Sequence, residues 1–362
     1  MIYHNFKKFN DRTALISQDN RTYSYSDILR FKEVLKKNFK KRSLTILLSD
    51  NSVESVMIYV SLVIIKMPIL LLNSSIRISD LNLLIKKFRI QNVLQPIKFE
   101  FNNKLFVSKK CILEKFLLST KKNYQNIEID KNLMLVLPSS GTMSESKLIK
   151  LSYQNYYQNT KSIVKYLKLN QNDRSITTMP SSYSYGLSVI NSHLMIGGSM
   201  VVGNFSLVDK KFWDMNSFYK PTNINGVPFF YDMLCKIGLS KLFNDKIKFF
   251  TVAGGKLNLK TFKKISKYFY DKKIKFFLMY GQTEASPRIA YHLHSKKDKD
   301  IGEVPTGKPI PGAKIYLYDS KNKMIKKNNV EGEIVLKGPN IFGGYASSVK
   351  DLSTMEKNKY LY

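Results

Sequence analysis

Residues 275–284 read Lys275-Phe276-Phe277-Leu278-Met279-Tyr280-Gly281-Gln282-Thr283-Glu284, an apolar run that ends abruptly in polar residues. The apolar half is typical of a buried strand, so the polar half lies where that strand ends. There the ring of Tyr280 can stack on a base, and Gly281 lets the backbone approach a ligand closely. Thr283 can bond a phosphate, and Glu284 can hold Mg²⁺. The same pattern also fits an ordinary turn with a solvated carboxylate.

A second polar stretch follows an apolar strand predicted at Leu133–Leu137 and reads Pro138-Ser139-Ser140-Gly141-Thr142-Met143-Ser144-Glu145-Ser146-Lys147. Backbone N–H groups, hydroxyls and an ammonium are the groups that bind phosphate oxygens. The stretch is not a Walker P-loop, because that motif opens directly into a helix, whereas a strand is predicted here at Leu148–Leu151. On its own it also fits a serine-rich surface turn.

A third candidate is Ala253-Gly254-Gly255-Lys256-Leu257, which follows an apolar strand predicted at Phe249–Val252. Two glycines at a strand end allow the backbone to pass close to a ligand. A bare turn is the simpler explanation of this stretch taken alone. The three stretches therefore gain their meaning from their combination.

Short apolar runs and helical patterns alternate through the first part of the chain, with strands predicted at 44–48 and 68–72 around a helix. This order predicts a layered α/β/α fold with mainly parallel sheets. The most membrane-like stretch is 56–72, but Lys66 and Pro68 interrupt it. We therefore expect a buried helix followed by a buried strand there, and no membrane span.

The end of the chain has a different pattern. Residues 314–318 and 332–337 alternate their side chains at period two, which predicts a small antiparallel β subdomain. We expect three subdomains: an α/β unit with the serine-rich loop at 1–170, a second α/β unit at 171–305, and the antiparallel unit at 306–362.

The composition narrows the class of partner. The chain has 362 residues and a formal net charge of +32, from 59 Lys and Arg against 27 Asp and Glu. Only eight of the 59 are Arg, the residue that nucleic-acid readers favour, so we expect a solvated lysine surface and no nucleic-acid partner.

The lysine-rich stretch 102–131 is expected to be peripheral. Cys111 and Cys235 lack metal or redox spacing, and the first ten residues lack an apolar core, so we expect a cytoplasmic protein.

Taken together and in this order, the stretches resemble the adenylate-forming superfamily, which includes acyl-CoA synthetases, adenylation domains of non-ribosomal peptide synthesis and luciferases. The phosphate loop of that family reads S/T-S-G-S/T-T-G-x-P-K-G and is similar to residues 139–148. Its Y-G-x-T-E motif is matched in full by residues 280–284. Its T-H-x-N, G-x-P-x-P-G and G-E-I/L-x-x-x-G-P blocks are similar to 152–155, 307–312 and 332–339.

The resemblance implies that ATP and Mg²⁺ bind, and it assigns roles residue by residue. The phosphates would be held by Ser139, Ser140, Gly141, Thr142 and Lys147. Adenine would lie between Tyr280 and the pair Gly254 and Gly255, with Lys256, Gly281 and Gln282 beside it. The implied catalytic residues are Thr283 at the acyl phosphate, Glu284 on Mg²⁺, and Lys147.

The implied reaction is the attack of a carboxylate on the α-phosphate of ATP, which gives an acyl-AMP and pyrophosphate. Members that activate amino acids place an Asp near Tyr183 to pair the substrate ammonium, whereas the residues around Tyr183 are uncharged. We therefore expect a small carboxylic acid with an uncharged acyl or aryl chain. Its pocket is predicted at Tyr183, Tyr185, Gly186, Gly226 and Val227. The acceptor would be coenzyme A or a carrier-protein thiol.

Two departures from the family pattern keep alternatives open. In the family motif, the second Gly, the Pro and the third Gly are replaced here by Ser144, Ser146 and Leu148. The sequence also stops where the family continues into a T-G-D block and a small C-terminal catalytic domain. We therefore expect a truncated, large N-terminal domain that is catalytically impaired by itself. A non-catalytic nucleotide-binding or scaffold module of the same fold is the alternative, and a nucleic-acid binder, suggested by charge alone, is the third.

Overall fold

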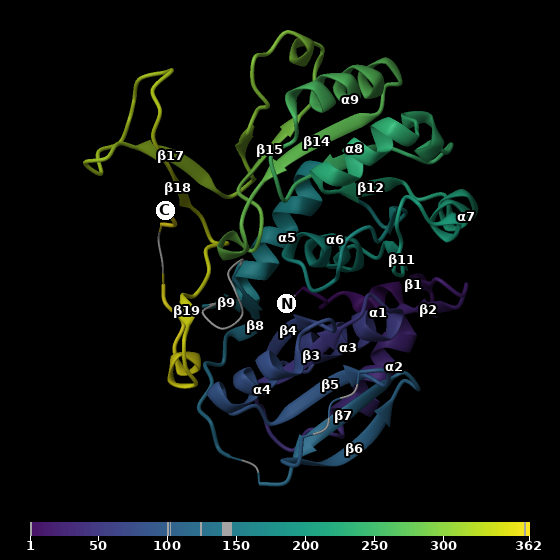
Figure 1. Cartoon of the computed structure of the whole chain (residues 1–362), viewed down its shortest axis with the longest axis vertical. Coiled ribbons are helices and arrows are strands. Elements are labelled where there is room, and N and C mark those ends of the chain that lie inside the picture. Colours follow the sequence, from purple (N-terminus) through teal and green to yellow (C-terminus); the bar gives the residue numbers. More distant parts are fainter. Residues whose placement is uncertain (1, 100, 102, 124, 140–146, 358–359) are drawn as a thin grey trace.

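The computed structural model describes residues 2–99, 101, 103–123, 125–139, 147–357 and 360–362. Its strands form two large sheets, which we call sheet A and sheet B, and a small two-stranded sheet C. Helices lie between the two large sheets and on their outer faces (Figure 1). The predicted layered α/β fold with mainly parallel sheets and a small antiparallel sheet is confirmed.

Sheet A has nine strands, of which the central six are parallel and the outer ones antiparallel. In spatial order the strands are β16 (Lys308–Pro309), β15 (Ala290–Leu293), β14 (Lys275–Tyr280), β13 (Phe249–Val252), β12 (Asn223–Gly226), β10 (Arg174–Ile176), β11 (Ser199–Val202), β1 (Thr13–Ser17) and β2 (Thr22–Ser24). The strands β13 and β14 are buried along almost their whole length, as their continuous apolar sequences predict.

Sheet B has eight strands, four of them parallel at its centre. In spatial order they are β19 (Tyr345–Ala346), β9 (Leu148–Ser152), β8 (Leu133–Pro138), β4 (Ile69–Asn73), β3 (Thr45–Ser49), β5 (Asn92–Pro96), β7 (Phe116–Lys121) and β6 (Phe106–Ile112). Sheet C pairs β17 (Lys314–Tyr318) with β18 (Glu333–Lys337) in the predicted antiparallel direction.

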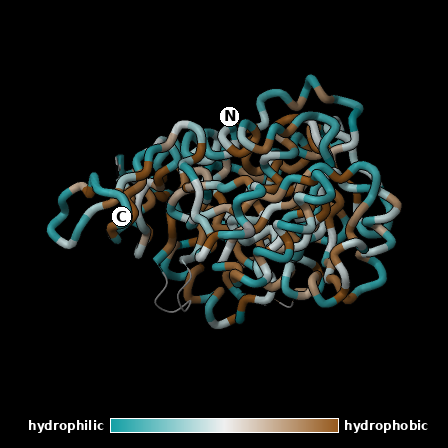
Figure 2. The backbone as a smooth tube through the Cα atoms, turned by 90° about the horizontal axis from the view of Figure 1, so that it is seen from above, coloured by the Kyte–Doolittle hydropathy of each residue, from teal (hydrophilic) through white to brown (hydrophobic). Residues whose placement is uncertain are grey.

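The helices form three layers around the two large sheets. The middle layer shares one apolar core with both sheets and contains α2 (Tyr25–Lys36), α3 (Val53–Ile64), α5 (Tyr153–Leu167) and α6 (Ser184–Met195). The outer face of sheet A is covered by α7 (Lys210–Tyr219), α8 (Pro228–Ile237) and α9 (Leu259–Asp271). The outer face of sheet B is covered by α4 (Ile78–Lys87), and the short α1 (Phe6–Phe9) packs on α2. Apolar segments accordingly gather in the body of the molecule, and hydrophilic ones follow its outer loops (Figure 2).

Local sequence explains where the middle helices begin. The hydroxyl of Ser24 caps α2 and that of Ser152 caps α5, each in a capping box closed by the residue three positions later. The helix α3 is buried on nearly every side because it lies between the sheets, which explains its membrane-like composition. Within the described residues, no helix combines the length and the apolar composition needed to cross a bilayer.

The expectation that 102–131 is peripheral was incomplete, because β6 and β7 from this stretch form the edge of sheet B. Phe116 and Leu118 of β7 are buried, whereas Lys109 and Lys110 of β6 are exposed. The lysines obscured the strand pattern because they occupy the solvent-facing positions of an edge strand.

The sheets exchange strands from opposite ends of the sequence. The strands β1 and β2 lie in sheet A, although the rest of the first 150 residues builds sheet B and the helices beside it. Conversely, β19 pairs with β9 and lies at the edge of sheet B. The three subdomains expected at 1–170, 171–305 and 306–362 follow the order of the chain and remain a prediction.

Candidate active site

A cavity of about 760 Å³ opens where β13 and β14 end and where α6 begins. This is the edge of a parallel sheet at which ligands commonly bind, because the loops after the strands gather there. The predicted residues that line the cavity are Tyr183, Tyr185, Gly254, Gly255, Lys256, Tyr280, Gly281, Gln282, Thr283 and Glu284. The structure therefore brings together two of the three stretches that the sequence singled out.

The glycine-rich turn after β13 touches the start of α6. Gly254 has a φ of +85°, and a Cβ added there would lie 2.4 Å from the hydroxyl oxygen of Tyr183. Glycine is therefore required at this position both for its backbone conformation and for the close approach of Tyr183. Gly255 and Lys256 are exposed on the cavity wall, and Tyr280 keeps 38% of its surface exposed. An accessible aromatic ring near an exposed glycine turn suits a flat ligand.

Tyr185 is fixed by a buried chain of hydrogen bonds. Its hydroxyl lies 2.6 Å from that of Thr251, which in turn donates to Asn225 Oδ1 at 2.6 Å. The amide of Asn225 donates to Asn223 Oδ1 at 2.9 Å, and all four residues are buried. A satisfied buried network of this kind holds a side chain in one position. The ring of Tyr185 is therefore a rigid part of the cavity wall.

The loop that follows β14 is folded tightly on itself. A Cβ at Gly281 would lie 1.8 Å from the carbonyl oxygen of Pro287, so no other residue fits without moving the backbone. The side-chain amides of Asn159 and Asn340 each donate to the carbonyls of Ala285 and Arg288, at 2.8–3.1 Å. Two buried amides thus clamp this loop from α5 and from the segment before β19.

Glu284 is linked to the serine-rich loop through Tyr345 of β19. The Tyr345 hydroxyl donates to Glu284 Oε1 at 3.0 Å, and Lys147 Nζ lies 5.5 Å from the centre of the Tyr345 ring. Burial and the nearby Glu284 carboxylate raise the pKa of Tyr345 to about 12, so its hydroxyl stays protonated at neutral pH. The backbone N–H of Ser139 donates to the Lys147 carbonyl at 3.1 Å and closes the base of the loop.

The arrangement suits one divalent cation held together with a ligand. Among the described residues, no group of three or more His, Cys, Asp or Glu is arranged to hold a metal. Mg²⁺ is usually held by one or two carboxylates, with substrate phosphates and water completing its shell. Glu284 lines the cavity and is half-exposed, so it can supply that carboxylate. The residues therefore fit Mg²⁺ bound with a phosphate-bearing ligand.

Other predicted residues lie elsewhere. A Cβ at Gly186 would lie 2.5 Å from the Pro180 carbonyl oxygen, and one at Gly226 would lie 2.6 Å from the Phe230 ring, so both glycines serve close packing. Val227 precedes α8 as its N-cap residue, and none of these three residues lines the cavity. Their role in binding the acid remains a prediction. Ser140, Gly141 and Thr142 fall outside the described residues.

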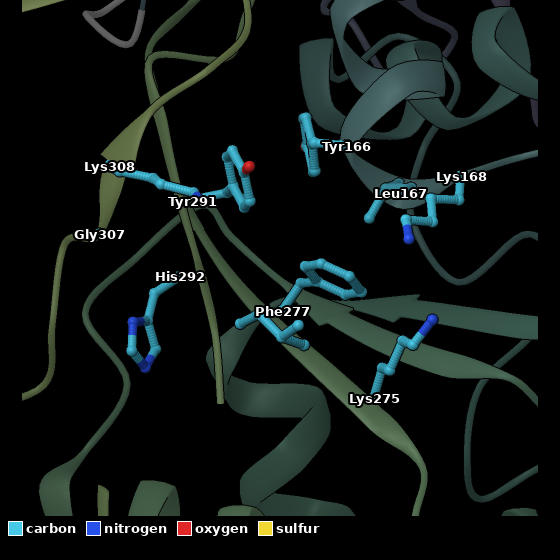
Figure 3. Close-up of a pocket in the computed structure, with 10 residues that line it drawn as sticks. Tyr166, Leu167, Lys168, Lys275, Phe277, Tyr291, His292, Gly307 and Lys308 are labelled. Carbon is cyan, nitrogen blue, oxygen red and sulfur yellow. The ribbon is translucent and has the colours of Figure 1, made fainter. Parts of the chain in front are cut away.

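A second cavity, of about 510 Å³, lies on sheet A around the stacked rings of Tyr166 and Tyr291 (Figure 3). The side chains of Lys168 and Lys275 extend toward each other across it. It contains none of the residues predicted for the site. The first cavity is therefore the candidate active site.

Several residues that shape the site were missed by sequence reasoning. They are Asn159, Arg288, Asn340 and Tyr345. Asn340 directly follows the block at 332–339, and Arg288 lies four residues after the block at 280–284, so position along the chain was an available signal for both. Asn159 and Tyr345 carry no such signal, because only the fold brings α5 and β19 to the loop after β14.

The chain is similar in sequence to curated CoA ligases. The chain is 26% identical over 266 residues to oxalate–CoA ligase from Saccharomyces cerevisiae, which covers 73% of this chain and 47% of that protein. It is 26% identical over 219 residues to 2-succinylbenzoate–CoA ligase from Bacillus mycoides, which covers 59% and 42%. The chain thus spans less than half the length of these curated relatives.

Solved structures show the same fold. O-succinylbenzoate coenzyme A synthetase from Bacillus subtilis in complex with AMP has a TM-score of 0.79 at 18% identity, covering 100% of this chain and 93% of that one. The N-terminal subdomain of NpsA from Klebsiella oxytoca, in complex with 3-hydroxybenzoyl-AMSN, has a TM-score of 0.76 at 16% identity, covering 97% and 90%. A sequence profile described as AMP-binding enzyme matches residues 2–346. The resemblance predicted from the motifs is confirmed, and the chain belongs to the AMP-binding enzyme family.

Proposed function

We propose that this chain binds ATP and a carboxylic acid and joins them as an acyl-AMP with release of pyrophosphate. The observation that carries the proposal is that Tyr280, Thr283 and Glu284 line the same cavity as the glycine turn after β13. Membership of the AMP-binding enzyme family and two curated CoA-ligase relatives support it. The fold shared with an AMP-bound synthetase is consistent with it.

The chain's own residues would act by positioning and by neutralising charge. Tyr280 and the glycine turn would hold the adenine, while Lys147 and Ser139 would hold phosphate oxygens. Thr283, whose hydroxyl donates to Ser184 Oγ at 3.2 Å, would be aimed at the phosphate that is attacked. A carboxylate oxygen of the acid forms the new bond to the α-phosphorus, and the bond from that phosphorus to the pyrophosphate oxygen breaks.

Glu284 would hold Mg²⁺, which neutralises phosphate charge when it is bound. Tyr345 would keep the Glu284 carboxylate oriented by donating to one oxygen and leaving the other free. Partners of this kind tune the affinity of a metal site although they do not touch the metal.

The acceptor of the acyl group would be coenzyme A, the acceptor named for both curated relatives, or a carrier-protein thiol. The reaction would take place in a reducing compartment such as the cytoplasm, which agrees with the two free thiols of Cys111 and Cys235.

The variant Glu284→Gln tests the metal assignment. It removes the negative charge with little change in shape, so we expect Mg²⁺-dependent binding of ATP to weaken by about tenfold, a typical metal-ligand effect. Titration calorimetry with ATP in Mg²⁺ and in EDTA measures it. Glu333→Gln, an exposed carboxylate at the start of β18, is the matched control and should bind like the unmodified chain. Unchanged affinity in Glu284→Gln would refute the assignment.

Acid-dependent exchange of labelled pyrophosphate into ATP tests the chemistry. A panel of small acids should include at least one that supports exchange and at least one that does not. ATP binding without exchange for any acid would favour the alternative, a nucleotide-binding module without chemistry. Absence of both would contradict the proposed function itself.

A further inference from the structure

A buried arginine lines the cavity, and no carboxylate of the described residues forms an ion pair with it. Arg288 is 3% exposed and belongs to the cavity wall. Among the residues that the structure describes, the ion pairs do not include it. One guanidinium nitrogen, Nη2, donates to Ser188 Oγ at 3.1 Å, while Nε has no hydrogen-bond partner in the part of the chain that the structure describes. A buried charge in this state is costly unless something else compensates it.

The surroundings of Arg288 compensate it only in part. Its guanidinium carbon lies 4.2 Å from the centre of the Tyr185 ring, close enough for a cation–π contact. The phenols of Tyr156 and Tyr166 are also near, and that of Tyr166 forms a hydrogen bond with the Arg288 side chain. Burial raises the pKa of all three tyrosines, so their phenols are neutral at neutral pH and supply no counter-charge.

The guanidinium is also held in a fixed place. Tyr185 is anchored through Thr251 and Asn225, and the Arg288 carbonyl accepts from the amides of Asn159 and Asn340. Both the side-chain platform and the backbone of Arg288 are therefore set before any ligand arrives. A fixed planar guanidinium is suited to bind a carboxylate through two parallel hydrogen bonds.

We propose that Arg288 is a specificity-determining residue that binds a second carboxylate of the acid, so that the substrate class is dicarboxylic acids. One carboxylate would react at the nucleotide, and the other would pair with Arg288 beside Tyr185. This inference rests on the proposed function and revises the expectation of an uncharged acyl chain, which considered only the residues near Tyr183. That expectation did not include Arg288, because Arg288 belongs to the loop after β14 and is distant from Tyr183 in the sequence.

Matched acids provide the test. Succinic, glutaric, phthalic and 2-succinylbenzoic acids are each compared with their monomethyl esters, which keep one carboxylate and lose the other charge. Calorimetry measures their binding to the full chain in the presence of Mg²⁺ and a non-hydrolysable ATP analogue. We expect at least one diacid to bind about tenfold or more tighter than its ester, as for a buried charge pair.

Variants then assign the preference to Arg288. Arg288→Met should abolish the preference for the diacid, and Arg288→Lys should keep part of it, because the charge remains without the planar fork. Arg174→Met is the matched control: Arg174 also lies over a tyrosine ring, that of Tyr219 at 5.9 Å, but it does not line the cavity. It should keep the preference unchanged.

The unliganded variant separates a binding role from a structural one. Because no described residue supplies a buried partner charge for Arg288, replacing it with Met removes an uncompensated desolvation cost, so we expect Arg288→Met without ligand to be at least as stable as the original chain. A large loss of stability with an unchanged acid preference would show a structural residue and overturn the proposal.

The remaining outcomes are distinct. If a monoacid binds and no diacid is preferred, the proposal fails while the proposed function stands. If Arg288→Met loses affinity for the ATP analogue about as much as for the diacid, Arg288 binds a phosphate and the proposal also fails. If the unmodified chain does not bind the ATP analogue, the proposed function fails, and this inference fails with it.

Discussion

At the scale of single residues, Gly281 determines whether the loop after β14 can form. A Cβ there would overlap the Pro287 carbonyl oxygen, so we expect Gly281→Ala to lower the free energy of unfolding by about 2–3 kcal/mol, in the range of overpacked cores. Gly302→Ala is the control, since nothing lies within 4 Å of a Cβ at that position. Chemical denaturation of both variants measures the difference. Equal midpoints would show that the loop adjusts at little cost.

The residue scale also shows the reach of sequence reasoning. Tyr280, Thr283 and Glu284 could be found because they share one short stretch and end one apolar strand. Arg288 and Tyr345 could not be given roles in the same way. Their roles depend on which ring or carboxylate lies opposite them, and those partners come from α6 and from the loop after β14.

At the scale of elements, α6 is attached to sheet A through a buried histidine. His193 Nδ1 donates to the Val189 carbonyl at 2.8 Å, and Nε2 accepts from the Asn223 amide at 2.9 Å. The contact with Asn223 requires the neutral ring, because a protonated Nε2 cannot accept, and burial lowers the pKa of His193 below its usual value of 6.5. As the pH falls below 6.5, the unfolded chain takes up a proton that the folded chain excludes, so stability falls until the folded pKa is reached.

Replacing this histidine should therefore flatten the pH dependence of stability. We expect His193→Gln to be less stable than the original chain at pH 7.5 but to lose less further stability between pH 7 and pH 5. Urea unfolding at a series of pH values measures both quantities. A slope as steep as that of the original chain would mean that other groups cause the acid sensitivity.

Elements also differ in how readily the sequence shows them. The strands β13 and β14 were predicted within two residues of their bounds, because buried parallel strands are continuously apolar. The edge strand β6 and its neighbour β7 were missed, because exposed lysines in β6 obscure the alternation of apolar and polar side chains expected of a strand. Strand order and the exchange of β1 and β19 between sheets leave no local pattern at all.

At the scale of the whole molecule, the net charge of +32 should destabilise the compact state through self-repulsion. Salt screens that repulsion, so we expect the melting temperature to rise by about 2 °C or more between 20 and about 300 mM NaCl. Thermal unfolding in NaCl and in KCl measures the rise and separates screening from the effect of one ion. A melting temperature that stays flat or falls would contradict it.

The same charge gives a simple distinction from the nucleic-acid alternative. A solvated lysine surface should attract duplex DNA only at low salt, with binding lost by about 150 mM. Sequence-dependent binding that survived at that salt concentration would instead support a dedicated nucleic-acid surface.

The exchange of strands between the two sheets has a consequence for how the protein is made. The strands β1 and β2 leave the ribosome long before β11, so β1 has no parallel neighbour until β11 has been synthesised. Likewise, β9, beside the serine-rich loop, can pair with β19 only after β19 has been synthesised. Pairings between such distant segments form slowly and leave apolar strand edges exposed in the meantime. Slower synthesis at low temperature, or a chaperone that shields the first hairpin, should therefore favour a high yield of folded protein.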